Sequence, residues 1–213
     1  MLGPPGAGKG TLAVKLSERL EVPHVSTGQV FRTAIREGTA LGHEVEAVLD
    51  SGSLVSDALT IGMVRERLAE ADAAPGALLD GYPRTLPQAT ALADFAPVMG
   101  ALAMVVDHEQ IIQRLSGRRT CGNCGAVYHI QHRPTKVAGT CDVCGRTVTR
   151  RPDDEPAAIR HRLAVYQREI VELEGYFRDR GLLRPIDAAA GPAAVLEAAV
   201  AVLLAPASST DRS

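Results

Sequence analysis

The hydrophobic positions of this chain recur at two spacings. Apolar residues recur every three or four positions in three segments and predict helices there, over residues 9–20, 57–71 and 159–180. Continuous apolar runs predict three short strands, over residues 77–80, 101–107 and 182–187. The run at 101–107 has the pattern of a strand buried on both faces. We therefore expect an α/β fold in which a parallel sheet is flanked by helices.

Two segments depart from this core pattern. Residues 26–55 are helical in pattern but weakly apolar, which indicates a small helical insert. Residues 117–154 contain all four cysteines and read as a second, β-rich insert. The predicted division is a core made of residues 1–25, 56–116 and 155–205, inserts at 26–55 and 117–154, and a disordered tail at 206–213.

Composition and charge narrow the class of protein. The chain has 213 residues, 46% of them hydrophobic. This length and content are sufficient for one core of aliphatic side chains with inserted segments. The net charge of −2 argues against general binding to nucleic acid or to a membrane surface. The apolar run at 193–205 contains Glu197 and is too short to span a bilayer. No leader segment is visible, so we expect a cytoplasmic protein, and we expect a monomer.

The strongest chemical signal is the loop Gly3-Pro4-Pro5-Gly6-Ala7-Gly8-Lys9-Gly10-Thr11. Its Gly-x-x-x-x-Gly-Lys spacing is that of a phosphate-binding loop at the start of a helix. Backbone N–H groups at the helix N-terminus can surround phosphate oxygens, and Lys9 adds a mobile positive charge. Gly10 stands where such loops usually carry the Ser or Thr that binds Mg²⁺, which weakens a motor-ATPase or GTPase interpretation.

Only Met1 and Leu2 precede this loop, although a buried strand of about five residues normally does. Either the true start lies upstream, or the sheet has a stub at its centre.

Further candidate ligands follow the strand at 77–80. Asp80 lies at its carboxyl end, where an α/β fold places ligand chemistry and where a carboxylate can orient hydrated Mg²⁺. Arg84 offers a planar fork for a phosphate, and Gln88 offers both a donor and an acceptor for a base edge. Arg114 and Arg118 share a face if the helix at 109–115 continues, and they then favour an anion. His24 is given no role.

The cysteines are spaced as Cys121-x2-Cys124 and Cys141-x2-Cys144, each pair followed by glycine. This spacing predicts a closed, structural, tetrahedral zinc site that staples a segment with little core of its own. A free zinc ribbon for nucleic acid and a zinc-stapled lid over a nucleotide both use such a site. Its position between Arg118 and Arg151 in a phosphate-loop chain favours the lid. Asp153 or Asp154 can cap the long helix that follows, with Pro156 in its first turn.

Three motifs together resemble the adenylate kinases, members of the nucleoside monophosphate kinase family. They are the loop at 3–11, the acceptor segment Ser26-Thr27-Gly28 with Arg32, and Asp80-Gly81-Tyr82-Pro83-Arg84-Thr85 with Gln88. The cysteine segment is similar to the lid of zinc-bearing bacterial adenylate kinases, and the likeness runs from Gly3 to about Leu204. It implies Mg²⁺-dependent, reversible phosphoryl transfer from ATP to AMP, giving two ADP. Thr85 stands where relatives that act on UMP or CMP commonly have Asn, which favours AMP.

The resemblance also implies roles for individual residues. The catalytic set would be Lys9, Arg84, Arg118, Arg151 and Arg162. The ATP-binding set would be Gly6, Ala7, Gly8, Lys9, Gly10, Thr11, Arg118, Val127 and Tyr128. The AMP-binding set would be Thr27, Arg32, Ser53, Leu54, Val55, Gly81, Tyr82, Pro83, Arg84, Gln88, Arg151 and Arg162. Asp80 would hold Mg²⁺ through water, and Asp153 and Asp154 would be charge partners of the arginines. A kinase for another nucleoside monophosphate, or a zinc-ribbon nucleic-acid-binding ATPase, remains the alternative.

Overall fold

The computed structural model describes residues 1–204, which form two compact units. The first unit contains residues 1–27, 56–106 and the chain from residue 166 onward, and the second contains residues 28–55 and 107–165. The tail predicted at 206–213 lies outside the described residues. No helix within residues 1–204 has the length and apolar character needed to cross a membrane.

The first unit is built on parallel strands, as expected from the apolar runs. Strand β1 (His24–Ser26) pairs with β2 (Leu78–Asp80), and β3 (Ala101–Val105) pairs with β7 (Leu183–Asp187). Pro185 is tolerated in β7 because this strand pairs with β3 alone among the described strands, which leaves its other edge free of ladder bonds.

Residues 1 and 2 join the two strand pairs. The amide of Leu2 donates to the carbonyl of Leu102 at 2.7 Å, and Met104 donates back to the carbonyl of Leu2 at 3.0 Å. The amino group of Met1 donates to the carbonyl of Leu79 at 2.7 Å. The order across the unit is therefore β1, β2, residues 1–2, β3 and β7.

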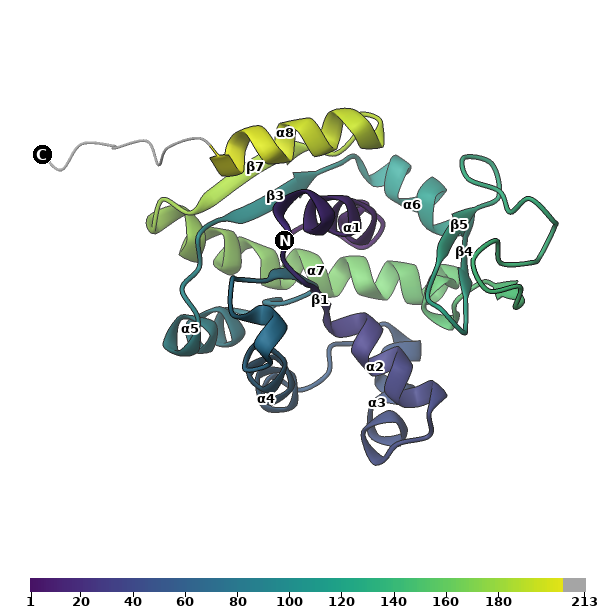
Figure 1. Cartoon of the computed structure of the whole chain (residues 1–213), viewed down its shortest axis with the longest axis horizontal. Helices are drawn as coiled ribbons and strands as arrows, with labels where there is room; N and C mark the ends of the chain where they lie inside the picture. Colours follow the sequence, from purple (N-terminus) through teal and green to yellow (C-terminus); the bar gives the residue numbers. More distant parts are fainter. Residues whose placement is uncertain (205–213) are drawn as a thin grey trace, which may run out of the picture. The chain divides into compact units, whose positions relative to one another are not determined.

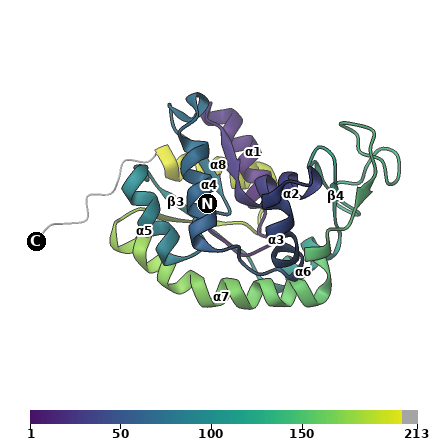
Figure 2. The ribbon, with the colours of Figure 1, turned by 90° about the horizontal axis from the view of Figure 1, so that it is seen from below.

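Helices cover both faces of this sheet (Figure 1). They are α1 (Lys9–Leu20), α4 (Asp57–Leu68), α5 (Leu86–Phe95), α8 (Pro192–Leu204) and most of α7 (Pro156–Asp179), with a 3₁₀ turn η1 (Ala71–Ala73). Because side chains alternate along a strand, Leu102 and Met104 pack among α1 and α8, whereas Ala101 and Ala103 pack among α5 and α7. Helices α4 and α5 lie side by side (Figure 2). The buried ring of Tyr82 packs against Val64 of α4 and Leu92 of α5.

The second unit holds helices and a small antiparallel sheet. Its elements are α2 (Thr27–Arg36), α3 (Ala40–Ser51), α6 (His108–Ser116), β4 (Arg118–Cys121), β5 (Val127–His129), β6 (Val148–Thr149), the 3₁₀ turn η2 (Pro152–Asp154) and the start of α7. The sheet order is β5-β4-β6. Helices α2 and α3 approach closely, since a Cβ on Gly42 would lie 2.2 Å from the carbonyl oxygen of Ala34.

Two sequence-based expectations are wrong here. Helix α6 ends at Ser116, so Arg118 lies at the start of a strand and does not share a helix face with Arg114. Asp153 and Asp154 lie in η2, with Glu155 between them and the first residue of α7, so neither caps that helix. Their carboxylates pair with arginines instead. Pro156 does begin α7, as expected.

Candidate active site and metal centre

The glycine loop at residues 3–11 folds into a cradle at the start of α1. Gly6 and Gly8 have φ of +82° and +98°, a conformation that glycine adopts without strain. Lys9 is the first residue of α1, and its Nζ donates to the carbonyls of Gly3 at 2.6 Å and Pro4 at 2.8 Å. The chain thus presents a helix N-terminus and a mobile cation at one place, the arrangement that suits an anionic ligand.

Asp80 lies next to this loop. A Cβ on Gly10 would lie 3.4 Å from Asp80 Oδ2, so the carboxylate adjoins the start of α1. His24 Nε2 and Ser26 Oγ each lie 3.4 Å from the same oxygen. Burial alone would raise the pKa of Asp80, but the hydrogen bond from His24 and the positive charge of Lys9 lower that pKa to about 2. Asp80 is therefore an ionised carboxylate at neutral pH and fits a water-mediated Mg²⁺ ligand.

Thr27, Gly81 and Arg84 come together at the end of β2. Thr27 Oγ1 and Arg84 Nε both donate to the carbonyl of Gly81, at 2.9 Å and 2.8 Å. A Cβ on Gly81 would lie 2.7 Å from Arg84 Nη2, so a larger residue would displace the guanidinium. Tyr82 is fully buried in the core, so only its backbone could contact a ligand in an acceptor site.

Gln88 is anchored by residues of the same unit. Its Oε1 accepts from the backbone amide of Arg84 at 2.8 Å, and its Nε2 donates to Asp57 Oδ1 at 2.7 Å. Thr85 Oγ1 donates to the same Asp57 oxygen at 3.0 Å. The two side chains that favour AMP by resemblance therefore share one carboxylate, which fixes the orientation of the Gln88 amide.

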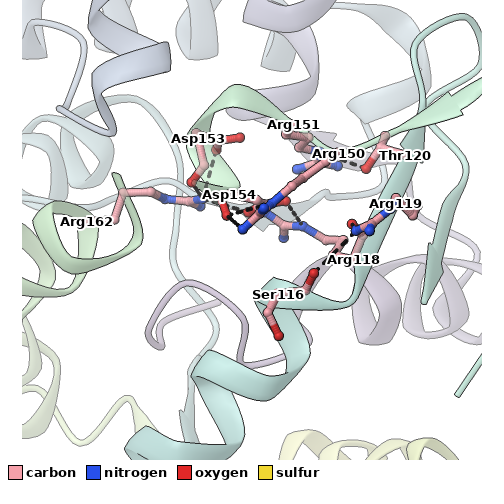
Figure 3. A network of polar contacts seen from close by, with 9 residues as sticks. All are labelled: Ser116, Arg118, Arg119, Thr120, Arg150, Arg151, Asp153, Asp154 and Arg162. Atoms are coloured by element: carbon pink, nitrogen blue, oxygen red, sulfur yellow. Dashed lines mark hydrogen bonds and ion pairs between the residues drawn. The ribbon is translucent and has the colours of Figure 1, made fainter. Parts of the chain in front are cut away.

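An arginine cluster lies in the second unit around η2 (Figure 3). Arg118 binds both carboxylate oxygens of Asp154, through Nη2 and through Nε at 2.7 Å. Arg162 Nη1 lies 2.8 Å from Asp153 Oδ2 and 3.5 Å from Asp154 Oδ1. The expectation that these two aspartates are charge partners of the arginines is confirmed.

Arg151 belongs to the same cluster. Its Nε donates to Thr120 Oγ1 at 2.8 Å. Burial, and after it the positive charges of Arg32 and Arg118, lower the pKa of Arg151 to about 9. Cations held this close repel one another, and an anion bound among them would relieve that repulsion. Asp153 and Asp154 offset part of this positive charge, and a bound phosphate would offset more of it.

The predicted site residues divide between the two units. In the first unit lie Gly6, Ala7, Gly8, Lys9, Gly10, Thr11, Thr27, Asp80, Gly81, Tyr82, Pro83, Arg84 and Gln88. In the second lie Arg32, Ser53, Leu54, Val55, Arg118, Val127, Tyr128, Arg151, Arg162 and the four cysteines. Within the second unit, Ser53 Oγ lies 3.0 Å from His161 Nε2, and the guanidinium of Arg32 lies over Gly28.

The four cysteines form a cluster in which every Sγ lies within 4.8 Å of the others. Cys121 and Cys144 have their sulfurs 3.4 Å apart, and Cys124 and Cys141 have theirs 3.5 Å apart. A tetrahedral Zn²⁺ with Zn–S bonds of about 2.3 Å requires S···S distances of about 3.8 Å, so the cluster fits such an ion. Both glycines that follow the pairs adopt positive φ, +75° at Gly125 and +71° at Gly145, as the tight turns require.

Two of these thiols are biased toward the thiolate that a metal binds. The hydrogen bond from Tyr128 lowers the pKa of Cys141 to about 6. The backbone amide of Arg146 lowers the pKa of Cys144. Tyr128 itself is buried against the cysteines, so its side chain is turned to the metal centre.

Sequence reasoning missed His24 and Asp57 as members of the site. Alternation along β1 places His24 and Ser26 on one side, and the parallel pairing of Ser26 with Asp80 brings both to that carboxylate. Asp57 looked like an ordinary acidic residue in the first turn of α4, because its partners lie 28 and 31 residues further along the chain.

Comparison with known proteins agrees with this geometry. A family model described as adenylate kinase matches residues 1–182. An adenylate kinase of Moorella thermoacetica is 47% identical over 202 residues, which cover 92% of this chain and 93% of the relative. One of Citrifermentans bemidjiense is 46% identical over 192 residues, covering 88% and 90%. One of Treponema denticola is 47% identical over 187 residues, again covering 88% and 90%. The glycine loop, the carboxylate beside it and this extent of similarity lead to one conclusion, that the chain belongs to the adenylate kinase family.

Proposed function

We propose that the chain catalyses the reversible, Mg²⁺-dependent transfer of the γ-phosphoryl group of ATP to AMP, giving two ADP. The observation that carries the proposal is the position of Asp80 beside the glycine loop, where a Cβ on Gly10 would lie 3.4 Å from the carboxylate. A loop that binds phosphates and a carboxylate that orients hydrated Mg²⁺ are the parts that phosphoryl transfer from a nucleoside triphosphate requires. Membership of the adenylate kinase family supports the same reaction.

The donor side of the reaction would use the loop and the lid segment, residues 117–154. The amides of residues 6–11 would surround the β- and γ-phosphates, with Lys9 as the cation that follows the transferring group. Arg118 and the backbone of β5 at Val127 and Tyr128 would contact ATP. Bound with ATP, Mg²⁺ would neutralise part of the phosphate charge, and Asp80 would hold it through water.

The acceptor side would use the residues around Gly81 and Gln88. Arg84 would hold the AMP phosphate, and Thr27 would lie on the adenine side. Gln88 would read the adenine edge in the orientation that Asp57 fixes. Arg32 and residues 53–55 would complete this side from the acceptor insert, residues 26–55.

Arginines of the second unit would stabilise the charge of the transferring group. Arg118, Arg151 and Arg162 form one cluster with Asp153 and Asp154. Phosphoryl transfer needs mainly alignment and charge compensation, and the role of an arginine is to stabilise charge that develops in the transition state.

The test is ADP formation from ATP and Mg²⁺ with AMP, UMP, CMP and GMP offered separately as acceptors. We expect turnover with AMP and at most traces with the others. Matched reactions without any acceptor measure hydrolysis, which should stay far below transfer. Preference for another acceptor would show that the substrate is a nucleoside monophosphate other than AMP. ATP consumption independent of any acceptor would contradict the proposal.

We also propose that the enzyme is a cytoplasmic monomer with a structural Zn²⁺. Four cysteines clustered as metal ligands are typical of a reducing compartment. Light scattering should give the mass of one chain, and metal analysis should give one Zn²⁺ per chain.

A further inference from the structure

The hydroxyl group of Tyr128 lies against the second cysteine pair. Its Oη is 3.3 Å from Cys141 Sγ, and the backbone amide of Asp142 donates to it at 2.8 Å. The side chain is 4% exposed and is packed in one cluster with Cys121 and Cys141. The resemblance assigned Tyr128 to ATP, yet its side chain is enclosed by the metal-binding segment.

The direction of these two hydrogen bonds follows from the groups involved. A backbone N–H only donates, so the oxygen of Tyr128 is the acceptor from Asp142. A cysteine that binds a metal is a thiolate and has no proton to give. The single phenolic proton of Tyr128 therefore goes to Cys141 Sγ, and both functions of the hydroxyl are satisfied in a buried site.

We propose that Tyr128 is a positioning residue of the metal centre: its hydroxyl donates to the Cys141 thiolate and ties the second cysteine pair to β5. Partners of this kind fix the orientation of a ligand and tune its charge, and their loss typically weakens metal binding by about 10- to 100-fold. A donated hydrogen bond also disperses the negative charge that four thiolates place around one divalent ion.

The strand pairing extends this role to the arginine cluster. Tyr128 pairs with Arg119 across β4 and β5, and the same strand β4 begins at Arg118 and ends at Cys121. The metal would thus hold β4 directly through Cys121, and hold β5 through Cys141 and Tyr128. This extension to Arg118 rests on the proposed function, whereas the effect on metal affinity does not.

The first experiment compares Tyr128→Phe with the unchanged protein in competition for Zn²⁺ against a chromophoric chelator. Phenylalanine keeps the ring and removes only the hydroxyl. We expect Zn²⁺ affinity to fall by about 10-fold or more, while the thermal midpoint of the metal-free protein stays the same. Equal Zn²⁺ affinity in the two proteins would overturn the proposal. An equal loss of stability with and without metal would do so too, because it would indicate packing alone.

Tyr176→Phe is the matched control. The ring of Tyr176 contacts Phe177 with centroids 5.2 Å apart and lies under the guanidinium of Arg180, contacts that phenylalanine keeps. Its Zn²⁺ affinity should equal that of the unchanged protein.

A second measurement needs no folded Tyr128 variant. The chain has four tyrosines and no tryptophan, so its near-ultraviolet absorption reports tyrosine directly. Removing Zn²⁺ from the intact protein should change this spectrum, and Tyr176→Phe should show the same change. A spectrum that stays the same after metal removal would contradict the hydrogen bond.

ADP formation by Zn²⁺-saturated Tyr128→Phe separates the role of Tyr128 in metal binding from the extension of that role to Arg118. Weakened metal binding with normal turnover supports the role in metal binding alone. If the intact protein makes no ADP, the proposed function fails but the metal role still stands or falls on Zn²⁺ affinity.

Discussion

The carboxylate of Asp154 is completely buried and accepts hydrogen bonds from Nε and Nη2 of the Arg118 guanidinium, with Arg118 Nε 2.7 Å from Asp154 Oδ2. Removing one partner of a buried ion pair leaves the other charge uncompensated, at a cost of about 3–5 kcal/mol. Asp154→Ala should therefore lower the free energy of unfolding by about 3 kcal/mol in urea denaturation. It should also reduce turnover, because Arg118 loses its orientation.

Glu155→Ala is the matched control for this change. Glu155 is the next residue and pairs with Arg150 at 3.5 Å, but its side chain is 58% exposed. Exposed pairs contribute about 0–1 kcal/mol, so this variant should stay close to the unchanged protein. Equal losses in the two variants would show that burial of Asp154 does not set the strength of its pair.

Lys9 is the cation of the glycine loop, and Lys9→Met removes the charge while keeping a side chain of similar length. Losing one preorganised charged donor at the transferring group should reduce kcat by about 10³-fold. Steady-state ADP formation measures the loss, and circular dichroism checks that the fold persists. Lys15→Met, an exposed change on the same helix α1, should leave turnover unaltered. Normal turnover by Lys9→Met would refute the assigned role.

Asp57 should control the acceptor without touching it. It accepts hydrogen bonds from Gln88 and Thr85, and such bonds to a charged group contribute about 1.5–3 kcal/mol. Asp57→Ala removes one of the two hydrogen bonds that orient the Gln88 amide, so KM for AMP should rise by about 10-fold while KM for ATP stays constant. Asp72→Asn serves as control, since Asp72 forms an exposed pair with Arg67 at 2.7 Å. An equal rise in both KM values would place Asp57 outside the acceptor side.

Metal removal should affect one segment first. Residues 118–149 form a sheet of short strands whose buried cluster consists mainly of Cys121, Tyr128 and Cys141. Without the ion this cluster supplies little apolar burial, so its local stability should collapse. Hydrogen exchange after chelation should become fast in this sheet while protection in β3 and α1 persists. Uniform protection with and without metal would contradict a structural metal.

Much of the first unit could be predicted from the sequence because its signals are local. The helix expected over 9–20 is α1, and the strands expected at 77–80 and 182–187 differ from β2 and β7 by one residue at most. Helical period, strand length and the glycine loop are each contained in a short stretch of sequence, so these signals do not depend on tertiary packing.

The features that the sequence did not predict, or predicted wrongly, depend on contacts between distant segments. The partnership of Asp57 with Gln88 and that of Asp154 with Arg118 span 31 and 36 residues. Local patterns suggested helix capping for Asp154 and continuation of α6 to Arg118, because capping and helix period are visible without a fold. In the structure Asp154 pairs with Arg118 instead, and Arg118 begins strand β4. Tyr128, on the neighbouring strand β5, has its hydroxyl group against Cys141.

Alkaline pH should weaken the fold through Tyr82. Burial, with a contribution from the negative charge of Asp57, raises the pKa of Tyr82 to about 12, whereas a tyrosine in an unfolded chain has a pKa of about 10. Between these values the unfolded chain loses a proton that the folded chain keeps. The folded state then binds more protons, so stability falls as pH rises.

The readout is the difference in unfolding free energy between the unchanged protein and Tyr82→Phe, because Arg151 and other groups titrate in the same range. This difference should shrink by about 1 kcal/mol for each pH unit between 10 and 12. Tyr166→Phe should behave alike, since burial also raises the pKa of Tyr166 to about 12. Urea denaturation at a series of pH values measures both. A difference that stays constant from pH 9 to about 11.5 would mean that Tyr82 ionises equally in the folded and unfolded chains, and its burial among α4 and α5 would then not exclude the charge.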